Sequence, residues 1–178
     1  REARGVLDLE MPERVIRLAK DGSVEAIANR QRLDSHKLIE EFMIAANVAA
    51  AETLEKAGRP CMYRVHDQPS KEKLESLRDV LDSVGIRFAR GGTPTPKRFN
   101  QILKKATATP HAPMVNEMVL RSQAQAEYAP GNIGHFGLAL GRYCHFTSPI
   151  RRYADLLVHR ALIESGRLGP GGLEKNPR

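Results

Sequence analysis

The sequence has little or none of several features, and each shortage excludes a class of protein. It has no tryptophan and only two cysteines, Cys61 and Cys144, among 178 residues. Two cysteines cannot build a disulfide framework, and their spacing to the histidines matches no zinc-binding pattern. We therefore expect reduced thiols in a cytoplasmic protein. No run of about 18 apolar residues is present, which argues against a membrane-spanning helix.

The first residues, Arg1-Glu2-Ala3-Arg4, lack both an initiator methionine and an apolar stretch. A secretory signal peptide requires the apolar stretch, so we do not expect one here. The missing methionine leads us to expect that the chain is part of a longer polypeptide. Its length suits one domain, or a large part of one, and is sufficient for a sizeable core.

Acidic residues are absent between Asp82 and Glu117, although the chain as a whole has 21 of them. Against 28 lysines and arginines the net charge is +7, and the acid-free segment contains Arg87, Arg90, Lys97, Arg98, Lys104 and Lys105. A basic face of this kind attracts phosphate groups, which makes nucleic acid a candidate partner. The alternative is a solvated, lysine-rich helix face.

Hydrophobic spacing and turn residues predict both strands and helices. Strands are expected at residues 6–9, 62–65, 123–128 and 136–140, and as a hairpin of 15–18 and 24–27 around Asp21-Gly22. Helices are expected from Asp34 or Ser35 to Gly58, and over residues 70–85, 98–106 and 114–120. Residues 166–178 contain Gly-Pro-Gly-Gly and no apolar period, so we expect a tail there.

The helix expected to begin at Asp34 or Ser35 is apolar around most of its circumference from Phe42 to Ala51. That pattern indicates burial on several sides. Asn47 lies within this stretch and is expected to be buried and hydrogen-bonded. Glu40 and Glu41 precede it. They either find partners in a buried setting or point to solvent, where acids in the first turns suit the helix dipole.

The stretch HFTSPIRRYAD, residues 145–155, is the most informative part of the chain. Thr147 or Ser148 is expected to cap a helix whose first residue is Pro149. This places Arg151 and Arg152 in the first helical turn, where the dipole disfavours cations. Such a conflict often marks a functional site. The apolar stripe expected to face the core consists of Ile150, Tyr153, Ala154, Leu157 and Ala161.

Two guanidinium groups beside the free N–H groups of a first helical turn would bind phosphate. Asp155 follows Arg151 by four residues and Arg152 by three, so it can hold one guanidinium in place. The alternative is a solvated Arg–Asp helix pair. We find neither a Ser–His hydrolytic arrangement nor a carboxylate cluster for metal-assisted phosphoryl transfer, and we assign no metal ligand.

Five blocks of the chain resemble, in the same order, the ribonuclease II/ribonuclease R family. They are RLDSHKLIEEFMIAANVAAA, YRVHDQPS, MVLRSQAQAEY, NIGHFGLAL and HFTSPIRRYADLLVHRAL. The resemblance covers about Gly5 to Ile163, and its details are nearer to ribonuclease R than to ribonuclease II. It implies an α+β fold of mixed helices and antiparallel strands. Residues 1–165 would be the C-terminal portion of an exoribonuclease catalytic domain.

The resemblance also implies an activity and roles for particular residues. The family members are processive 3′→5′ exoribonucleases that use Mg²⁺ to hydrolyse single-stranded RNA to nucleoside 5′-monophosphates. Arg151 would be the catalytic arginine that contacts the phosphate near the scissile bond, with Arg152 a weaker candidate. Glu41, or else Glu40, would contact the 3′-terminal nucleotide. The remaining expected RNA contacts are Thr147, Ser148, Lys97 and Arg98.

The chain departs from the family in one respect. The metal-binding aspartates and the base-stacking aromatic residue of the family lie upstream of the matched blocks and are absent here. The Mg²⁺ ligands are thus expected outside this fragment. The fragment would be inactive alone and would have the remainder of the catalytic domain as a partner. The alternatives are a non-catalytic RNA-binding or scaffold protein of the same fold, and a basic helical domain unrelated to nucleic acid.

Overall fold

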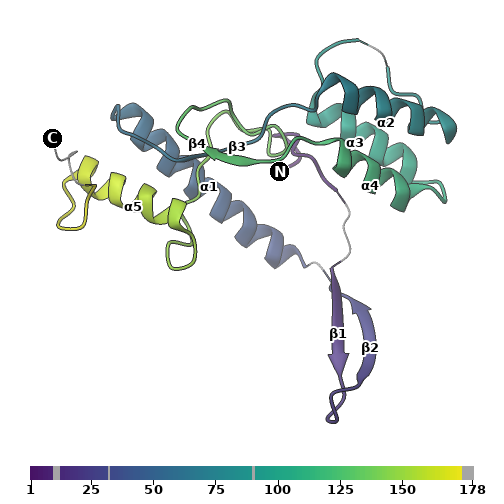
Figure 1. Ribbon diagram of the computed structural model, residues 1–178, viewed down its shortest axis with the longest axis horizontal. Coiled ribbons are helices and arrows are strands. Elements are labelled where there is room, and N and C mark those ends of the chain that lie inside the picture. Colours follow the sequence, from purple (N-terminus) through teal and green to yellow (C-terminus); the bar gives the residue numbers. More distant parts are fainter. Residues whose placement is uncertain (10–12, 32, 90, 174–178) are drawn as a thin grey trace.

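The computed structural model describes residues 1–9, 13–31, 33–89 and 91–173, and its helices and antiparallel strands confirm the α+β class. Figure 1 shows a helical layer at the right, a crossing pair of helices at the left and a projecting hairpin below. The elements in chain order are β1 (Arg14–Leu18), β2 (Val24–Asn29), α1 (Asp34–Lys56), β3 (Tyr63–Val65), α2 (Lys71–Ser83), α3 (Pro96–Thr107), α4 (Ala112–Ser122), β4 (Glu127–Ala129) and α5 (Tyr153–Gly166).

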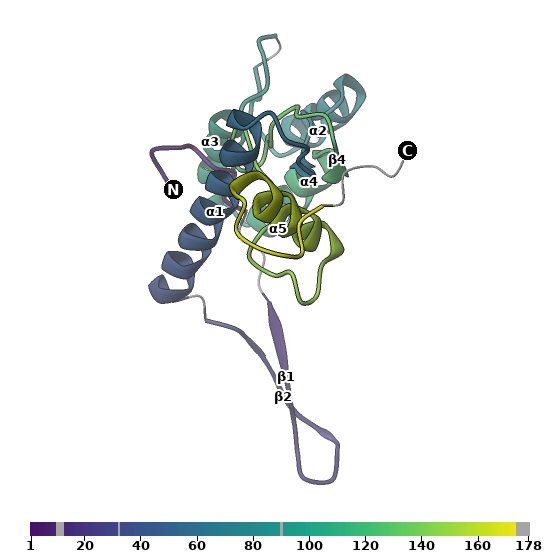
Figure 2. The same ribbon diagram turned by 90° about the vertical axis from the view of Figure 1, so that its left-hand side faces the viewer.

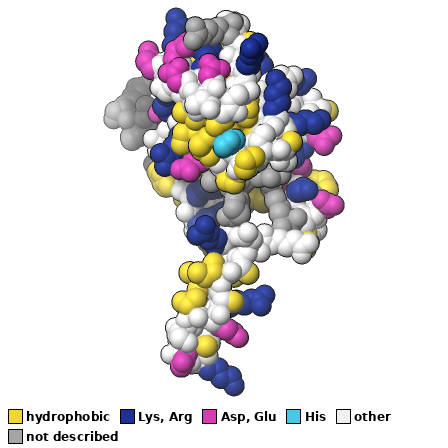
Figure 3. Space-filling model, turned by 90° about the vertical axis from the view of Figure 1, so that its right-hand side faces the viewer, with side chains coloured by type: hydrophobic (Ala, Val, Ile, Leu, Met, Phe, Trp, Pro, Cys, Tyr) yellow, Lys and Arg dark blue, Asp and Glu magenta, His cyan; other side chains and the backbone are white. Residues whose placement is uncertain are grey.

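The expected hairpin is confirmed as the antiparallel pair β1 and β2. At its turn the Asp21 carboxylate accepts hydrogen bonds from the N–H and hydroxyl of Ser23, and Gly22 adopts a φ of 84°. Ile16 lies opposite Ile27 in the ladder. Every residue of both strands is exposed, and Figure 3 shows the hairpin standing clear of the body with apolar side chains facing solvent.

Helix α1 begins at Asp34 as expected, although its N-cap is Leu33, whose N–H donates to His36 Nδ1. One face of its second half is buried, and on that face Asn47 is 3% exposed and hydrogen-bonded, as predicted. The expectation of burial on several sides from Phe42 to Ala51 is wrong, because Ala45 and Ala49 are exposed and only one face is covered. Phe42 is 64% exposed and Met43 38%, because no described segment packs over that end of the helix.

The right-hand helical layer, named here the three-helix core, is built by α2, α3 and α4. Ser70 caps α2 by accepting a hydrogen bond from the Lys73 N–H, as its sequence predicts. All three helices lie where hydrophobic spacing places them. Phe99 at the centre is fully buried, and the layer also contains Leu74, Leu77, Leu81, Ile86, Phe88, Ile102, Leu103, Ala106, Val115 and Val119.

A second cluster, the α1–α5 core, joins the C-terminal half of α1 to β3 and α5. Leu54 of α1, Val158 of α5 and Cys144 are each at most 1% exposed within it. Strand β3 pairs with β4 and also forms an isolated bridge between Tyr63 and Cys144. The chain that follows β4 contacts both cores, since Phe136 packs against the three-helix core and Cys144 belongs to the α1–α5 core.

Three expected strands are wrong in whole or in part. Residues 6–9 form no strand, because Leu7 donates its N–H to Gly137 and packs its side chain against the three-helix core. Only the end of 123–128 joins β4, since Gln123 instead bonds back to the last turn of α4. Residues 136–140 form a tight turn closed by an isolated bridge between His135 and Leu140, with Ala139 at a φ of 52°.

The last described residues fold back on α5, which ends at Gly166. Leu173 donates its N–H to the Arg160 carbonyl, and the Arg160 guanidinium donates to the carbonyl of Gly172. The division into residues 1–165 and a tail stays a prediction, and residues 174–178 lie outside the described part. None of the described helices is both long enough and apolar enough to cross a membrane.

The two apolar settings should respond differently to truncation. Phe99→Ala removes a fully buried ring and should lower the free energy of unfolding by about 3–5 kcal/mol. Ile16→Ala on the exposed hairpin should cost less than about 1 kcal/mol. Denaturant unfolding of both variants measures the difference, and equal losses would contradict this assignment of the core.

Candidate functional site

The expected phosphate-binding stretch is a loop rather than the start of a helix. Helix α5 begins at Tyr153, with Arg152 as its N-cap in an extended conformation (φ −133°, ψ 118°). The predicted cap at Thr147 or Ser148 and the helical start at Pro149 are therefore wrong. The N–H groups of Arg151 and Arg152 both donate to the Ser148 carbonyl at 3.2 Å, which closes a turn before the helix.

This shift changes which side chains face solvent. Ile150 and Tyr153, expected in the core, are 98% and 71% exposed. The buried face of α5 is instead formed by Asp155, Val158 and Ala161. The two arginines lie on the turn outside the helix, and the Ser148 N–H that would have faced a phosphate donates to Asp155 at 2.8 Å. A phosphate at this site would therefore be bound by side chains more than by the free N–H groups of a helix N-terminus.

Asp155 holds one of the two guanidinium groups, as the spacing predicts. Its carboxylate is fully buried and receives a hydrogen bond from Arg152 Nη2 at 2.8 Å, with Nε of the same group 2.8 Å from its other oxygen. Arg151 is exposed, and its guanidinium reaches only the Ser148 hydroxyl at 3.5 Å. No described carboxylate pairs with Arg151, so its charge remains available to a ligand.

Asn47 of α1 holds the same loop from the other side. Its Oδ1 accepts hydrogen bonds from the N–H groups of Phe146 at 2.8 Å and Thr147 at 3.3 Å, and its Nδ2 donates to the Tyr143 hydroxyl at 3.1 Å. The ring of His159 stacks on Phe146 and bonds to its carbonyl. The loop is thus fixed between α1 and α5.

Glu40 and Glu41 both have partners from the first residues of the chain. Arg1 approaches Glu40 at 3.1 Å, and Arg4 Nη2 donates to both carboxylate oxygens of Glu41 at 3.1 Å. Both acids remain partly accessible. Glu41 precedes Asn47 by six residues on α1. Helix α1 therefore connects Glu41 to the loop that Asn47 holds.

Lys97 and Arg98 lie elsewhere, at the start of α3 on the opposite side of the molecule from α5 (Figures 1 and 2). The Arg98 guanidinium donates to the carbonyls of Ala89, Gly91 and Thr93, so it stabilises the preceding loop. Thr147, Ser148, Arg151 and Arg152 lie on or at the end of the loop between α1 and α5, and Glu41 lies on α1. Arg98 lies apart from them, whereas the Lys97 side chain lies against Gly5, next to the Arg4 that pairs with Glu41. Arg90 lies outside the described residues.

Sequence reasoning missed a group of rings beside the loop. His66 donates from Nε2 to the Ala124 carbonyl and accepts from the Gly137 N–H, an approach so close that a Cβ at Gly137 would lie 3.0 Å from the ring. His135 packs edge-on against His66, and the Tyr128 hydroxyl lies 2.7 Å from His145 Nδ1. These side chains come from distant segments, and no local spacing signals their meeting.

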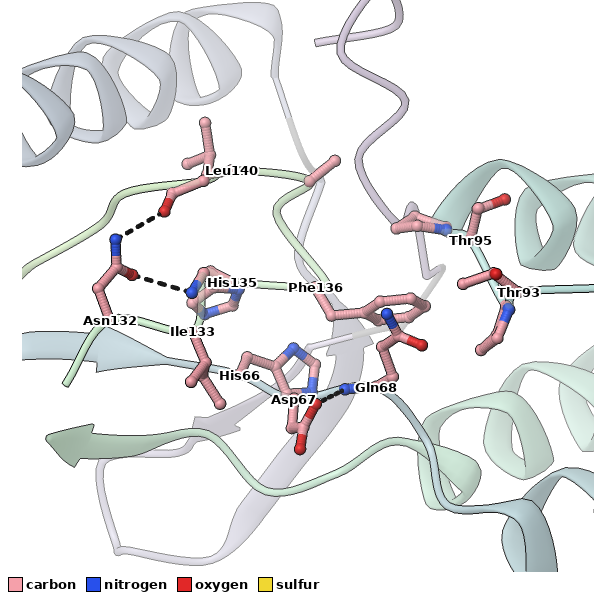
Figure 4. Close-up of a pocket in the computed structure, with 15 residues that line it drawn as sticks. His66, Asp67, Gln68, Thr93, Thr95, Asn132, Ile133, His135, Phe136 and Leu140 are labelled. Carbon is pink, nitrogen blue, oxygen red and sulfur yellow. Dashed lines mark hydrogen bonds between the residues drawn. The ribbon is translucent and has the colours of Figure 1, made fainter.

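A cavity of about 550 Å³ opens beside His66 and His135, a size that suits a small ligand (Figure 4). Asp67, Gln68, Thr93 and Asn132 add polar groups to its wall. Among the described residues that line it, none is a site residue assigned from the sequence. Nor do the described residues anywhere gather three His, Cys, Asp or Glu side chains that could hold a metal ion, so they offer no fit for Mg²⁺.

Comparison with known proteins finds one protein family that this chain resembles. The family model of the RNB domain matches residues 1–165 of the sequence. Ribonuclease R of Escherichia coli K12 is 47% identical over 162 residues, which cover 91% of this chain and 20% of that protein. The structure of Mycoplasma genitalium RNase R with ribose-methylated single-stranded RNA has a TM-score of 0.83 at 31% identity, covering 91% of this chain and 26% of that one.

A second solved structure differs in function. Yeast Ssd1, described as a pseudonuclease, has a TM-score of 0.66 at 27% identity, over 82% of this chain and 18% of its own. The chain spans about a fifth of the length of the curated relatives it matches.

The ring group makes stability depend on pH. Burial, with His66 adding to it, lowers the pKa of His135 to about 4, and burial together with Arg152 lowers the pKa of His145 to about 4. In the unfolded chain histidine titrates near 6.5, so as the pH falls below that value protons bind the unfolded chain first. The free energy of unfolding should therefore decline from about pH 6.5 towards pH 4.

Thermal unfolding at pH 7 and pH 5 measures this decline. The double variant His135→Asn, His145→Asn should lose less stability between the two pH values than the unmodified chain. His111→Asn, at an exposed position on the far helical layer, is the matched control and should leave the decline unchanged. A double variant that retains the full decline would contradict the assignment to these two rings.

Proposed function

The chain belongs to the RNB domain family, and from that premise we propose that it forms part of a 3′→5′ exoribonuclease that hydrolyses RNA to nucleoside 5′-monophosphates. One observation carries the proposal. Arg151 presents an exposed guanidinium without a carboxylate partner among the described residues, on a loop that Asn47 and Asp155 hold in place. Such a group suits a phosphate contact, because its planar fork matches phosphate oxygens.

The chemistry proposed for Arg151 follows from its charge. As water attacks a phosphodiester, negative charge grows on the non-bridging oxygens, and a fixed guanidinium stabilises that charge more in the transition state than in the ground state. Arg152 is engaged by Asp155 and would act mainly by shaping the turn. Ser148 would add a hydroxyl contact beside it. Thr147 remains a proposed RNA contact, through its backbone, because its hydroxyl oxygen is buried.

Glu41 is proposed to contact the 3′-terminal nucleotide. A carboxylate accepts hydrogen bonds, so ribose hydroxyl groups are suitable partners for it. Its two oxygens face Arg4, which would orient the carboxylate before RNA arrives. Lys97 and Arg98 remain proposed RNA contacts. Because the Arg98 N–H groups already serve carbonyls, its contribution would be mostly long-range charge.

The remainder of the catalytic domain is proposed to cover the apolar surface of β1, β2 and the first half of α1. The hairpin pairs with no third strand among the described residues, and an isolated two-stranded hairpin is marginal in water. Phe42, Leu38 and Ile39 continue the exposed apolar surface on α1. Carboxylates in that remainder would hold Mg²⁺, and the cytoplasm would be the location, consistent with two unpaired cysteines.

A second candidate is a non-catalytic RNA-binding or scaffold protein of the same fold. The likeness to Ssd1, a pseudonuclease, favours keeping it. The two candidates differ in whether the longer protein cleaves RNA, which the experiments below decide.

Arg151→Ala in the longer protein should depress turnover by a factor of about 10²–10³, because one preorganised contact to the transition state is lost. RNA affinity should change little, since many other phosphate contacts remain. Arg151→Lys should recover only part of the loss. Single-turnover cleavage of a short RNA, with binding measured without metal, separates the two effects.

Two matched variants accompany this test. Arg121→Ala removes an exposed arginine of α4 and should leave turnover unchanged. Arg152→Ala leaves the buried Asp155 carboxylate without its cationic partner. It should therefore lower thermal stability more than Arg151→Ala or Arg121→Ala does. If Arg151→Ala cleaves at the parental rate, or loses only affinity, then Arg151 is a binding or structural residue.

The isolated 178-residue chain should release no mononucleotides from single-stranded RNA in the presence of Mg²⁺, since its described residues form no group able to hold the ion. The longer protein assayed in parallel is the positive control. Metal-dependent release of mononucleotides by a nuclease-free sample of the chain would overturn the expectation of inactivity.

A further inference from the structure

We propose that Asn47 is a positioning residue, whose buried side chain fixes the loop of Arg151 to the helix of Glu41. The inference rests on the proposed function, because its consequence is the relative placement of two RNA-contacting side chains. Asn47 itself is 3% exposed and would not touch RNA. Its effect would pass through the loop.

The loop needs such a partner because its backbone has few others. Buried N–H groups must be hydrogen-bonded, and those of Phe146 and Thr147 lie in no helix or sheet. Both donate to Asn47 Oδ1, which uses both acceptor sites of the amide oxygen. The amide nitrogen donates to the Tyr143 hydroxyl, and the Asn47 carbonyl oxygen lies 3.3 Å from Cys144 Sγ. Asn47 thus contacts the segment 143–147 at both of its ends.

The position of Asn47 along α1 places its contact with the loop close to both proposed RNA contacts, Glu41 and Arg151. Glu41 precedes it by six residues, about 9 Å along a helix, and Arg151 follows Thr147 by four residues. A second tie, the ion pair between Arg142 and Glu55 at 2.8 Å, is half-exposed and joins the chain before the loop begins. Among the described residues, Asn47 is therefore a buried, hydrogen-bonded connection between the helix of Glu41 and the loop of Arg151.

An apolar residue would fill the same space without holding the loop. Leucine has the same number and branching of side-chain heavy atoms as asparagine, but it would leave the N–H groups of Phe146 and Thr147 without an acceptor, at about 1–3 kcal/mol for each group that stays buried. The loop would shift to reach water or another acceptor. A displacement of about 1 Å at a reacting group can lower turnover on the order of 10²-fold.

The experiment compares three variants of the longer protein. Asn47→Leu removes the tie. Asn47→Asp keeps acceptors for both N–H groups and can accept from the Tyr143 hydroxyl. Asn116→Leu is the matched control, since Asn116 is also buried on a helix but lies in α4. The readouts are single-turnover cleavage, RNA affinity without metal, thermal unfolding, and hydrogen exchange of the peptide spanning residues 143–150.

Asn47→Leu should lower turnover on the order of 10²-fold with nearly unchanged affinity, and should speed exchange in the 143–150 peptide. Asn47→Asp should restore most of both. Asn116→Leu should lose stability while keeping parental turnover and exchange. If Asn47→Leu does not fold, Tyr143→Phe removes only the hydroxyl that accepts from Asn47, and it should still speed exchange in this peptide.

Parental turnover in Asn47→Leu, or an equal loss in Asn116→Leu, would overturn the positioning role. Hydrogen exchange separates this inference from the proposed function. If the unmodified longer protein does not cleave RNA, the proposed function fails, whereas unchanged exchange in both Asn47→Leu and Tyr143→Phe would show that Asn47 does not hold the loop.

Discussion

The backbone N–H groups of Phe146, Thr147 and Ser148 depend on side chains for their hydrogen bonds, and this dependence shapes the site. Apart from the bridge between Tyr63 and Cys144, residues 143–152 lie outside every sheet and helix that the structure describes. Asn47 and Asp155 supply the missing acceptors from α1 and α5. Because the α1–α5 core fixes these two helices against each other, the packing of that core determines where the loop and Arg151 lie.

The two adjacent arginines have different environments for the same reason. Asp155 is buried and needs a cation, and Arg152 is close enough to provide one. A buried carboxylate without its partner is costly, so Arg152 is committed to the structure. Arg151 follows the turn outward and stays exposed. The two arginines thus differ in role because their partners differ: Arg152 is structural and Arg151 faces the ligand.

Local signals in the sequence were sufficient for the hairpin, for α1 and for the three-helix core. Asp21-Gly22 marks a turn and Ser70 a helix start, and neither depends on distant residues. The spacing also predicted that Asp155 would hold one arginine. The block resemblance, rather than any periodicity, pointed to RNA.

Other features depend on contacts across the chain and could not be predicted locally. The N-terminal end of α5 was misplaced because Asp155 takes the Ser148 N–H and Arg152 adopts an extended conformation. The pairing of Glu41 with Arg4 joins residues 37 apart. The exposed Phe42 was not predictable for another reason, since an apolar pattern does not say which segment covers it, and no described segment does.

We propose that Arg151, and not its neighbour, meets the RNA backbone. Nuclear magnetic resonance of the arginine side chains in the longer protein tests this directly, when an uncleavable single-stranded oligoribonucleotide is added without metal. We expect the Arg151 guanidinium signal to shift on binding, whereas the Arg152 signal, fixed by Asp155, should change little. A shift at Arg152 with an unchanged Arg151 would contradict this proposal.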